Sequence, residues 1–215
     1  MATAVIGGTG ALGHGVAIRL AAAGEPVVIG SRDAGRAAAA AAAANALVGG
    51  EAVSGAANAA AAAAGEIVFV CVPFAAQEET LLTIRDAVAG KVVVETTVPL
   101  VPGRPTELQP VAEGSAAQRA QALLGPAARV VSGLHHLSAG LLADPQATID
   151  SDVLICGDDP AARAAALALI GRLGWRAFDA GPLRMAQTLE RFTPLLIGLN
   201  RRLKRQHIGL RLTGV

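Results

Sequence analysis

Short apolar runs alternate with longer stretches of helical character along most of this chain. The first run spans residues 2–6, and a glycine-rich turn separates it from residues 11–23, where apolar side chains recur at helical spacing. Pro26 then opens a second apolar run at residues 27–29. A strand, a turn, a helix and a second strand within about thirty residues predict a βαβ unit.

The same alternation continues toward the C-terminus. Residues 67–72 form a wholly apolar run, which is typical of a central parallel strand covered on both faces. Further strands are expected at residues 91–94, 129–132, 153–156 and 175–178, with helices between them. Closely spaced prolines predict an irregular loop over residues 96–110. Together the pattern predicts an α/β fold, a Rossmann-type doubly wound and mostly parallel sheet.

The last part of the chain breaks this alternation. Gly181 and Pro182 interrupt the chain, and residues 183–204 predict one longer helix. We expect this helix to be interrupted or kinked near Pro194, because proline cannot donate the helical hydrogen bond. The sequence therefore predicts a Rossmann domain at residues 1–181 and a small C-terminal helical segment at residues 182–215.

Composition narrows the range of partners. The 215 residues, 53% of them hydrophobic, suffice for one domain with its own core. Aromatic residues make up 2% and tyrosine is absent, which argues against base stacking and a nucleic-acid partner. A net charge of +1 gives no general attraction to polyanions. We find no signal peptide and no apolar run of membrane length, and therefore expect a cytoplasmic protein without membrane contact.

The two cysteines suggest no special chemistry. Cys71 and Cys156 each lie in an apolar, strand-like run, which favours buried, reduced thiols. Their spacing matches no metal-binding motif, and the histidines do not complete one. We therefore expect no metal site.

The turn after the first strand contains a G-x-G-x-x-G motif, Gly8-Thr9-Gly10-Ala11-Leu12-Gly13. Because it follows a strand and opens a helix, it is typical of dinucleotide binding. Gly8 would allow the tight turn, Gly10 the approach of the pyrophosphate, and Gly13 close packing of the helix. The first helical N–H groups would bind the phosphates. The alternative is a glycine-rich turn without a ligand.

The end of the second strand indicates which dinucleotide binds. NAD enzymes place Asp or Glu there, about twenty residues beyond the glycine turn, whereas this chain has Ser31 and Arg32. A hydroxyl and a guanidinium favour the 2′-phosphate of NADP, and Arg36 lies one helical turn further on. The alternative is that both arginines are solvated surface charges.

Other candidate residues follow later strands, because ligands in doubly wound sheets lie beyond the carboxyl ends of the strands. They are Pro73 and Phe74, the loop of residues 96–99, which ends at Pro99, and the loop of residues 133–138, which contains His135. His135 is a candidate positioning residue, and an ordinary loop histidine is the alternative. Without tyrosine, a Tyr–Lys proton relay is impossible, so hydride transfer between two organic cofactors fits the chain well.

Several stretches resemble the F420-dependent NADP oxidoreductases. They are VIGGTGALGHGVAIRL from residue 5, VIGSR from residue 28, VVSGLH from residue 130, VLICGDD from residue 153, FDAGPL from residue 178 and LERFTPLL from residue 189. The glycine turn is common to Rossmann proteins, whereas the combination is more specific. The chain departs from the family at Phe74, where a tryptophan is expected, and at His136-Leu137-Ser138, which replaces an isoleucine–proline pair.

This resemblance implies an enzyme that transfers hydride between NADP(H) and the deazaflavin coenzyme F420. NADP would lie on residues 9–12 and on Ser31, Arg32 and Arg36. F420 would stack against the nicotinamide beside His135, in a cleft that the C-terminal segment closes. A homodimer is also implied. The alternatives are an NADPH-dependent reductase of a flavin or of a small carbonyl or imine compound, and an NADP-sensing module without turnover.

Overall fold

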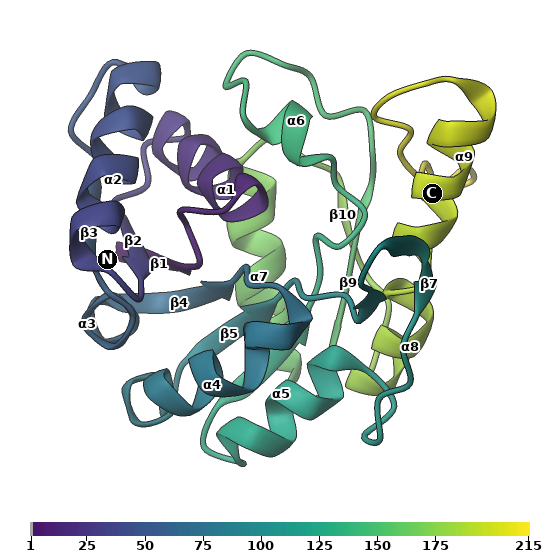
Figure 1. Cartoon of the computed structure of the whole chain (residues 1–215), viewed down its shortest axis with the longest axis horizontal. Helices are drawn as coiled ribbons and strands as arrows, with labels where there is room; N and C mark the ends of the chain where they lie inside the picture. Colours follow the sequence, from purple (N-terminus) through teal and green to yellow (C-terminus); the bar gives the residue numbers. More distant parts are fainter. Residues whose placement is uncertain (1) are drawn as a thin grey trace.

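An eight-stranded β-sheet forms the centre of the computed structural model, which describes residues 2–215 (Figure 1). Its strand order is β10-β9-β8-β5-β4-β1-β2-β3. The strands are β1 (Ala2–Ile6), β2 (Val27–Ser31), β3 (Val53–Ala57), β4 (Gly65–Val70), β5 (Val92–Glu95), β8 (Arg129–Ser132), β9 (Val153–Gly157) and β10 (Ala177–Asp179). The chain order reverses between β1 and β4, so the predicted doubly wound, mostly parallel sheet is confirmed.

Helices cover both faces of the sheet (Figure 1). One face carries α1 (Ala11–Ala22), α2 (Ala34–Val48), the short α6 (Ala139–Leu142) and α7 (Pro160–Arg172). The other carries α3 (Asn58–Ala64), α4 (Phe74–Ile84), the 3-10 turn Asp86–Val88 and α5 (Ala116–Leu124). Successive strand residues alternate between the two cores, as Val5 and Ile6 show.

One pair of neighbouring strands departs from the parallel order. β8 and β9 are antiparallel, and β10 pairs parallel with β9. The long connection from β8 to β9 contains only the four-residue helix α6. Because the two strands are antiparallel, β9 starts at the end of the sheet where β8 finishes. The connection therefore needs no crossover helix to return the chain to the opposite end of the sheet.

The predicted irregular loop over residues 96–110 is partly wrong, because it contains a β-hairpin. Strands β6 (Leu100–Val101) and β7 (Arg104–Leu108) pair antiparallel around Pro102 and Gly103. Gly103 has φ +76°, and proline followed by a glycine with positive φ is typical of a type II turn. The prolines therefore shape the turn without preventing pairing.

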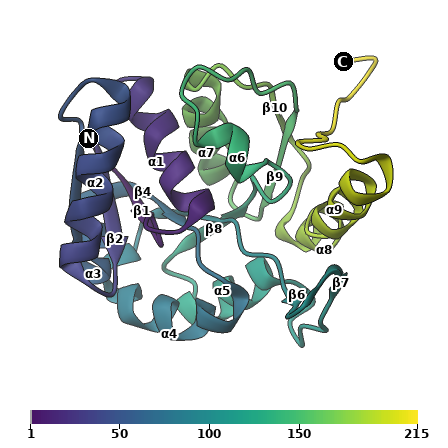
Figure 2. The same cartoon turned by 45° about the horizontal axis from the view of Figure 1, so that its top comes forward.

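The C-terminal segment is not the one long helix predicted for residues 183–204, because the helix is interrupted at Glu190 and Arg191, shortly before Pro194. It contains the 3-10 turn Leu183–Met185, α8 (Ala186–Leu189) and α9 (Phe192–Leu203), with Pro194 in the first turn of α9. Leu183, Ala186 and Leu189 are buried in the core that also contains α3, α4 and α5. Figure 2 shows α8 and α9 beside the hairpin, and α9 contacts β7. None of the helices described for residues 2–215 is both long enough and apolar enough to span a bilayer.

Candidate functional site

In the turn after β1, neighbouring atoms leave no room for a side chain at three glycines. Gly7 has φ +78°, and a Cβ atom there would lie 2.5 Å from the carbonyl oxygen of Cys71. The turn therefore needs glycine at Gly7 as well as at Gly8, where a Cβ would meet the Ile29 side chain at 2.8 Å and the Val5 backbone oxygen at 2.9 Å. At Gly13 a Cβ would lie 2.5 Å from the Gly7 oxygen. Because glycine has no Cβ, α1 can start directly against the turn.

The N-terminus of α1 has the features of a phosphate site. Gly10 is its N-cap residue, with no side-chain cap and no acidic residue in the first turn. A Cβ at Gly10 would meet only the Gly7 oxygen, at 3.4 Å, so the approach to the helix end is open. Uncapped N–H groups and the positive end of the helix dipole suit an anion. The residues present therefore fit the pyrophosphate of a dinucleotide.

A hollow of about 170 Å³, called here the phosphate hollow, adjoins this helix end. It is lined by Gly7, Thr9, Gly10, Ser31, Arg32, Asp33, Arg36, Asn58, Cys71, Val72, Pro73 and Thr80. Both arginines are exposed, and neither forms an ion pair within residues 2–215. The phosphate hollow thus brings together five residues that the sequence predicts for the site: Thr9, Gly10, Ser31, Arg32 and Arg36.

Two further contacts prepare this hollow for an anion. The Asp33 carboxylate accepts a hydrogen bond from the Arg36 backbone N–H at 3.0 Å, so it caps α2. Ser31 Oγ accepts from the Asp33 N–H at 3.3 Å, which leaves the Ser31 hydroxyl proton to donate elsewhere. Ser31, Arg32 and Arg36 together can therefore offer donors to a 2′-phosphate.

A second hollow of about 300 Å³, called here the ring hollow, continues from the first through Gly10, Cys71, Val72 and Pro73. Its other lining residues are Ala11, Leu12, Thr96, Thr97, Val98, Leu100, His135 and Thr193. Thr193 belongs to α9, so the C-terminal segment forms part of the wall. Thr193 Oγ1 donates to the backbone oxygen of His135 at 2.9 Å, which ties α9 to the loop after β8.

His135 is the one imidazole on the ring hollow within the described chain. It is buried, and its Nε2 lies 2.9 Å from Ser132 Oγ, while its Nδ1 has no partner. Burial, together with the neighbouring His136, lowers the pKa of His135 to about 3. His135 is therefore neutral at any ordinary pH, and it can position a ligand by hydrogen bonding without acting as an imidazolium acid.

Cys71 lies where the two hollows meet, but it is not a nucleophile. Burial raises the pKa of its thiol to about 12, and the nearby Glu95 adds to the shift. A thiol that stays protonated is a poor attacking group. The site thus combines a cationic hollow, an uncapped helix end and a neutral hollow, an arrangement that binds cofactors and offers no strong acid, base or nucleophile.

The comparisons with known proteins agree with this geometry. Residues 2–99 match the family described as "NADP oxidoreductase coenzyme F420-dependent". An F420-dependent NADP reductase of Methanothermobacter marburgensis is 39% identical over 222 residues, which cover 100% of this chain and 99% of that protein. The chain belongs to this family. The corresponding reductase of Methanocaldococcus jannaschii is 35% identical, again over 100% of this chain and 99% of that protein.

The structural comparison extends the similarity over the whole family fold. A crystal structure of a putative F420-dependent NADP reductase from Arthrobacter sp. FB24 matches with a TM-score of 0.85 and 30% identity. The match covers 99% of both chains. A Streptomyces aurantiacus imine reductase, at 20% identity and a TM-score of 0.65, shares only the fold. The C-terminal half therefore follows the family architecture as well.

Four sequence-predicted residues lie outside both hollows: Gly8 and Gly13, which shape the glycine turn, and Phe74 and Pro99. Phe74 begins α4, and its ring packs under the guanidinium of Arg119 at 5.1 Å from the ring centre. Pro99 lines a separate hollow beside α8 and α9. Contact of Phe74 or Pro99 with a cofactor stays a prediction from the sequence alone.

The sequence reasoning missed several lining residues. Asn58 begins α3 after a weakly marked strand, and only its place after β3 could have indicated it. Leu100 belongs to the unpredicted hairpin, and Thr193 to a helix whose contacts depend on tertiary packing. Thr193 does lie within the LERFTPLL stretch that carries the family resemblance.

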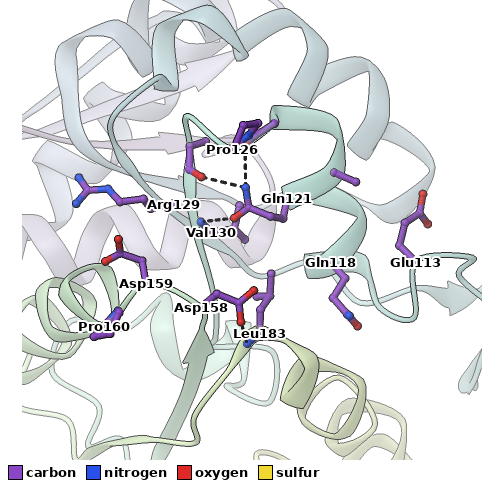
Figure 3. Close-up of a pocket in the computed structure, with 13 residues that line it drawn as sticks. Glu113, Gln118, Gln121, Pro126, Arg129, Val130, Asp158, Asp159, Pro160 and Leu183 are labelled. Atoms are coloured by element: carbon purple, nitrogen blue, oxygen red, sulfur yellow. Dashed lines mark hydrogen bonds between the residues drawn. The ribbon is translucent and has the colours of Figure 1, made fainter.

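Another surface hollow, of about 850 Å³, lies at the opposite end of the parallel strands from the glycine turn. Figure 3 shows the residues that line it. Its polar groups serve the fold. The Gln121 amide bonds to Gly125, Ala128 and Val130, as the dashed lines show, and Asp158 accepts the Leu183 N–H (Figure 3). Among residues 2–215 no cluster of three His, Cys, Asp or Glu side chains could hold a metal ion.

Proposed function

We propose that this protein is an NADPH-dependent F420 reductase, an enzyme that transfers hydride between NADP(H) and coenzyme F420. The observation that carries the proposal is the pair of joined hollows on the glycine turn, one cationic and one neutral. The family, and relatives printed as F420-dependent NADP reductases over the full chain, support the same reaction.

The glycine turn and the end of β2 would hold NADP(H). Gly8, Thr9, Gly10, Ala11, Leu12 and Gly13 form the turn and the uncapped helix end that suit the pyrophosphate. Arg32, Arg36 and the Ser31 hydroxyl would bind the 2′-phosphate, because a guanidinium fork matches phosphate geometry. No carboxylate occupies the position that NAD enzymes use for the ribose hydroxyls.

The ring hollow would hold the nicotinamide and the deazaflavin. Pro73, His135 and Thr193 approach it from three elements, so it can place two ring systems against each other. Bound NADP(H) and F420 supply the hydride donor and acceptor. The chain would bind and orient the two cofactors and exclude water from them. The neutral His135 side chain is suited to holding a ring by a hydrogen bond.

The division of labour between the segments follows from this arrangement. Residues 1–181 would form the NADP-binding unit, and residues 182–215 would close the cleft through Thr193. Because Leu183, Ala186 and Leu189 share a core with the Rossmann helices, the C-terminal segment is a functional unit rather than a separately folded one.

The outer side of α9 suggests the assembly. Of its residues only Leu196 is buried, whereas Leu195 and Leu203 are 52% and 59% exposed. Such a helix is typical of an interface, and we infer a homodimer that covers it. Light scattering should give twice the chain mass, and Leu195→Glu with Leu203→Glu should give the monomer. We also infer a cytoplasmic location, which the two free, buried cysteines support.

The deciding experiment mixes the purified protein with NADPH and oxidised F420 and follows the loss of deazaflavin absorbance. NADH, FAD and FMN are tested in parallel. Rapid bleaching specific to NADPH and F420 is the expected result. Bleaching with a flavin instead would indicate a flavin reductase, and tight NADPH binding without any turnover would indicate a sensing module.

A further inference from the structure

The loop after β8 has an unfavourable backbone conformation directly before His135. Leu134 has φ +64°, in the left-handed region that side chains other than glycine avoid. Its side chain is fully buried, and its backbone oxygen accepts the Leu137 N–H at 3.1 Å, so His135 lies within a tight turn. Such a conformation persists only where the surrounding structure holds it. The contacts that hold this loop therefore help to place His135 at the ring hollow.

His136 supplies one of these contacts. It is 6% exposed, and its Nε2 atom lies 2.6 Å from the backbone oxygen of Asp152, the residue directly before β9. Because a carbonyl oxygen can only accept, Nε2 carries the proton and donates it. Burial lowers the pKa of His136, although the contact with Asp152 opposes the shift. A buried imidazole thus ties the start of the long β8–β9 connection to its end.

Asp152 is also the point where residues 205–215, called here the tail, attach beside the sheet. Its N–H donates to the Leu210 oxygen at 2.7 Å, and its Oδ2 accepts the Leu212 N–H at 2.7 Å. The Asp152 side chain is fully buried, and its Oδ1 lies 3.1 Å from Arg176 Nε in an ion pair. One buried residue therefore joins the tail to the end of the β8–β9 connection.

The tail contacts the same connection at two further points. His207 Nδ1 lies 2.5 Å from the hydroxyl oxygen of Ser138, which is the N-cap residue of α6. At Gly209 the backbone approaches so closely that a Cβ would lie 2.6 Å from the Cβ of Ser151. The tail thus lies against both the early and the late part of the connection that carries His135.

We propose that His136 and Asp152 are positioning residues, through which the tail fixes the loop that presents His135 to the ring of F420. This inference rests on the proposed function, because it assigns the deazaflavin to the ring hollow. The phosphate hollow is lined by other residues, so the affinity for NADPH should not depend on these contacts. The tail would then act on one cofactor and not on the other.

The test alters each contact separately and pairs each change with a control. His136→Leu removes the donor to Asp152, whereas His136→Gln retains an N–H group at a similar reach. Gly209→Ala pushes the tail away from the sheet, and Gly171→Ala is its control, because a Cβ at Gly171 would point into open space. Hydrogen exchange of the Leu137 amide is measured without ligand. Fluorescence titration gives the Kd for F420 and for NADPH.

We expect His136→Leu and Gly209→Ala to exchange the Leu137 amide faster than wild type, because the loop opens more often. Both variants should bind F420 about 3- to 10-fold more weakly, as for the loss of one neutral hydrogen bond. Their Kd for NADPH should be unchanged. His136→Gln and Gly171→Ala should match wild type in all three measurements.

Four results would overturn the inference. Unchanged exchange of the Leu137 amide in His136→Leu or Gly209→Ala would show that the altered contact does not hold the loop. Faster exchange with unchanged F420 affinity would show that the loop does not position the ring. Equal losses of F420 and NADPH affinity would indicate a general loss of structure, and a His136→Gln protein that behaves like His136→Leu would exclude the hydrogen bond as the cause.

Failure of the proposed function would look different. Wild-type protein that binds NADPH but not F420 would reject that function, and with it the positioning of the deazaflavin. The exchange of the Leu137 amide in the same variants would still decide whether the tail holds the loop, because that measurement needs no cofactor.

Discussion

The two walls of the cleft are built from different kinds of segment. The wall that faces the phosphates comes from short contiguous stretches, residues 7–13 and 31–36, at the ends of two adjacent parallel strands. The wall around the ring hollow joins Leu100, His135 and Thr193, which lie on a hairpin, a loop and the last helix. Under the proposed function, local motifs would therefore determine how the dinucleotide is held, and long-range packing would determine what lies opposite its reactive end.

The largest expected effect concerns the phosphate wall. Arg32→Glu replaces a charge-assisted contact, worth about 1.5–3 kcal/mol, with repulsion, so NADPH affinity should fall by at least about 100-fold. NADH, which lacks the 2′-phosphate, should lose far less. Fluorescence titration with both nucleotides measures the difference.

Arg104→Glu is the control for this reversal. Arg104 is exposed on the hairpin, pairs with Glu107 at 2.7 Å, and lines neither hollow. Its reversal should leave NADPH affinity unchanged. An equal loss of NADPH and NADH binding in Arg32→Glu would mean that Arg32 does not contact the 2′-phosphate.

Two glycines in the same turn should separate stability from binding. In Gly13→Ala the new methyl meets the Gly7 oxygen at 2.5 Å, and such overpacking costs about 1–3 kcal/mol of unfolding free energy. Gly10 has φ −85° and open space, so Gly10→Ala should fold normally and weaken NADPH binding, where the methyl obstructs the phosphates. Thermal unfolding and NADPH titration on both variants give the comparison. A Gly10→Ala protein with full affinity would place the pyrophosphate elsewhere.

The contrast between the walls also explains what could be predicted from the sequence. The strand and the glycine motif are local signals, so the βαβ unit and the residues Thr9, Gly10, Ser31, Arg32 and Arg36 were predicted correctly as neighbours. The need for glycine at Gly7 was missed, since its positive φ depends on how the turn meets Cys71.

The other wall depended on contacts that no local pattern contains. The β6–β7 hairpin was not predicted, because the four prolines around it are typical of an irregular loop. Nothing in the sequence near Thr193 indicates that its hydroxyl donates to the backbone oxygen of His135. The antiparallel β9 has the same apolar composition as a parallel strand, so its direction could not be predicted from the run itself. An interruption near Pro194 was predictable, because proline is tolerated in the first turn of a helix and not in its interior.

The C-terminal segment is attached by a buried carboxylate, which should make its docking dependent on pH. Glu190 is 2% exposed and accepts hydrogen bonds from the N–H groups of Ala116 and Ala117 at 3.0 and 3.1 Å. Burial raises the pKa of Glu190 to about 7, although these hydrogen bonds oppose the shift. Burial also raises the pKa of the nearby Glu95 to about 7.

The direction of the pH effect follows from the raised pKa values. The unfolded chain releases these protons near pH 4.5, while the folded protein keeps them to about pH 7. The contribution of Glu190 and Glu95 to the free energy of unfolding is complete below pH 4.5. It is lost as the pH rises to about 7, by about 1.4 kcal/mol per pH unit for each group. Glu190→Gln should remove about half of this slope in denaturant unfolding series from pH 4.5 to 8. A slope equal to that of wild type would show that Glu190 titrates normally.

The smallest expected effect lies where the segment touches the ring hollow. Thr193→Val keeps the shape of the side chain but removes the hydroxyl that donates to the His135 oxygen, which should loosen α9 against the loop after β8. Because one neutral hydrogen bond is lost, we expect the KM for F420 to rise by about 3- to 10-fold while the KM for NADPH stays the same. Thr193→Ser, which retains the hydroxyl, should behave as wild type. If both substitutions raise the two KM values equally, the walls are not independent, and the C-terminal segment would then also shape the phosphate side of the cleft.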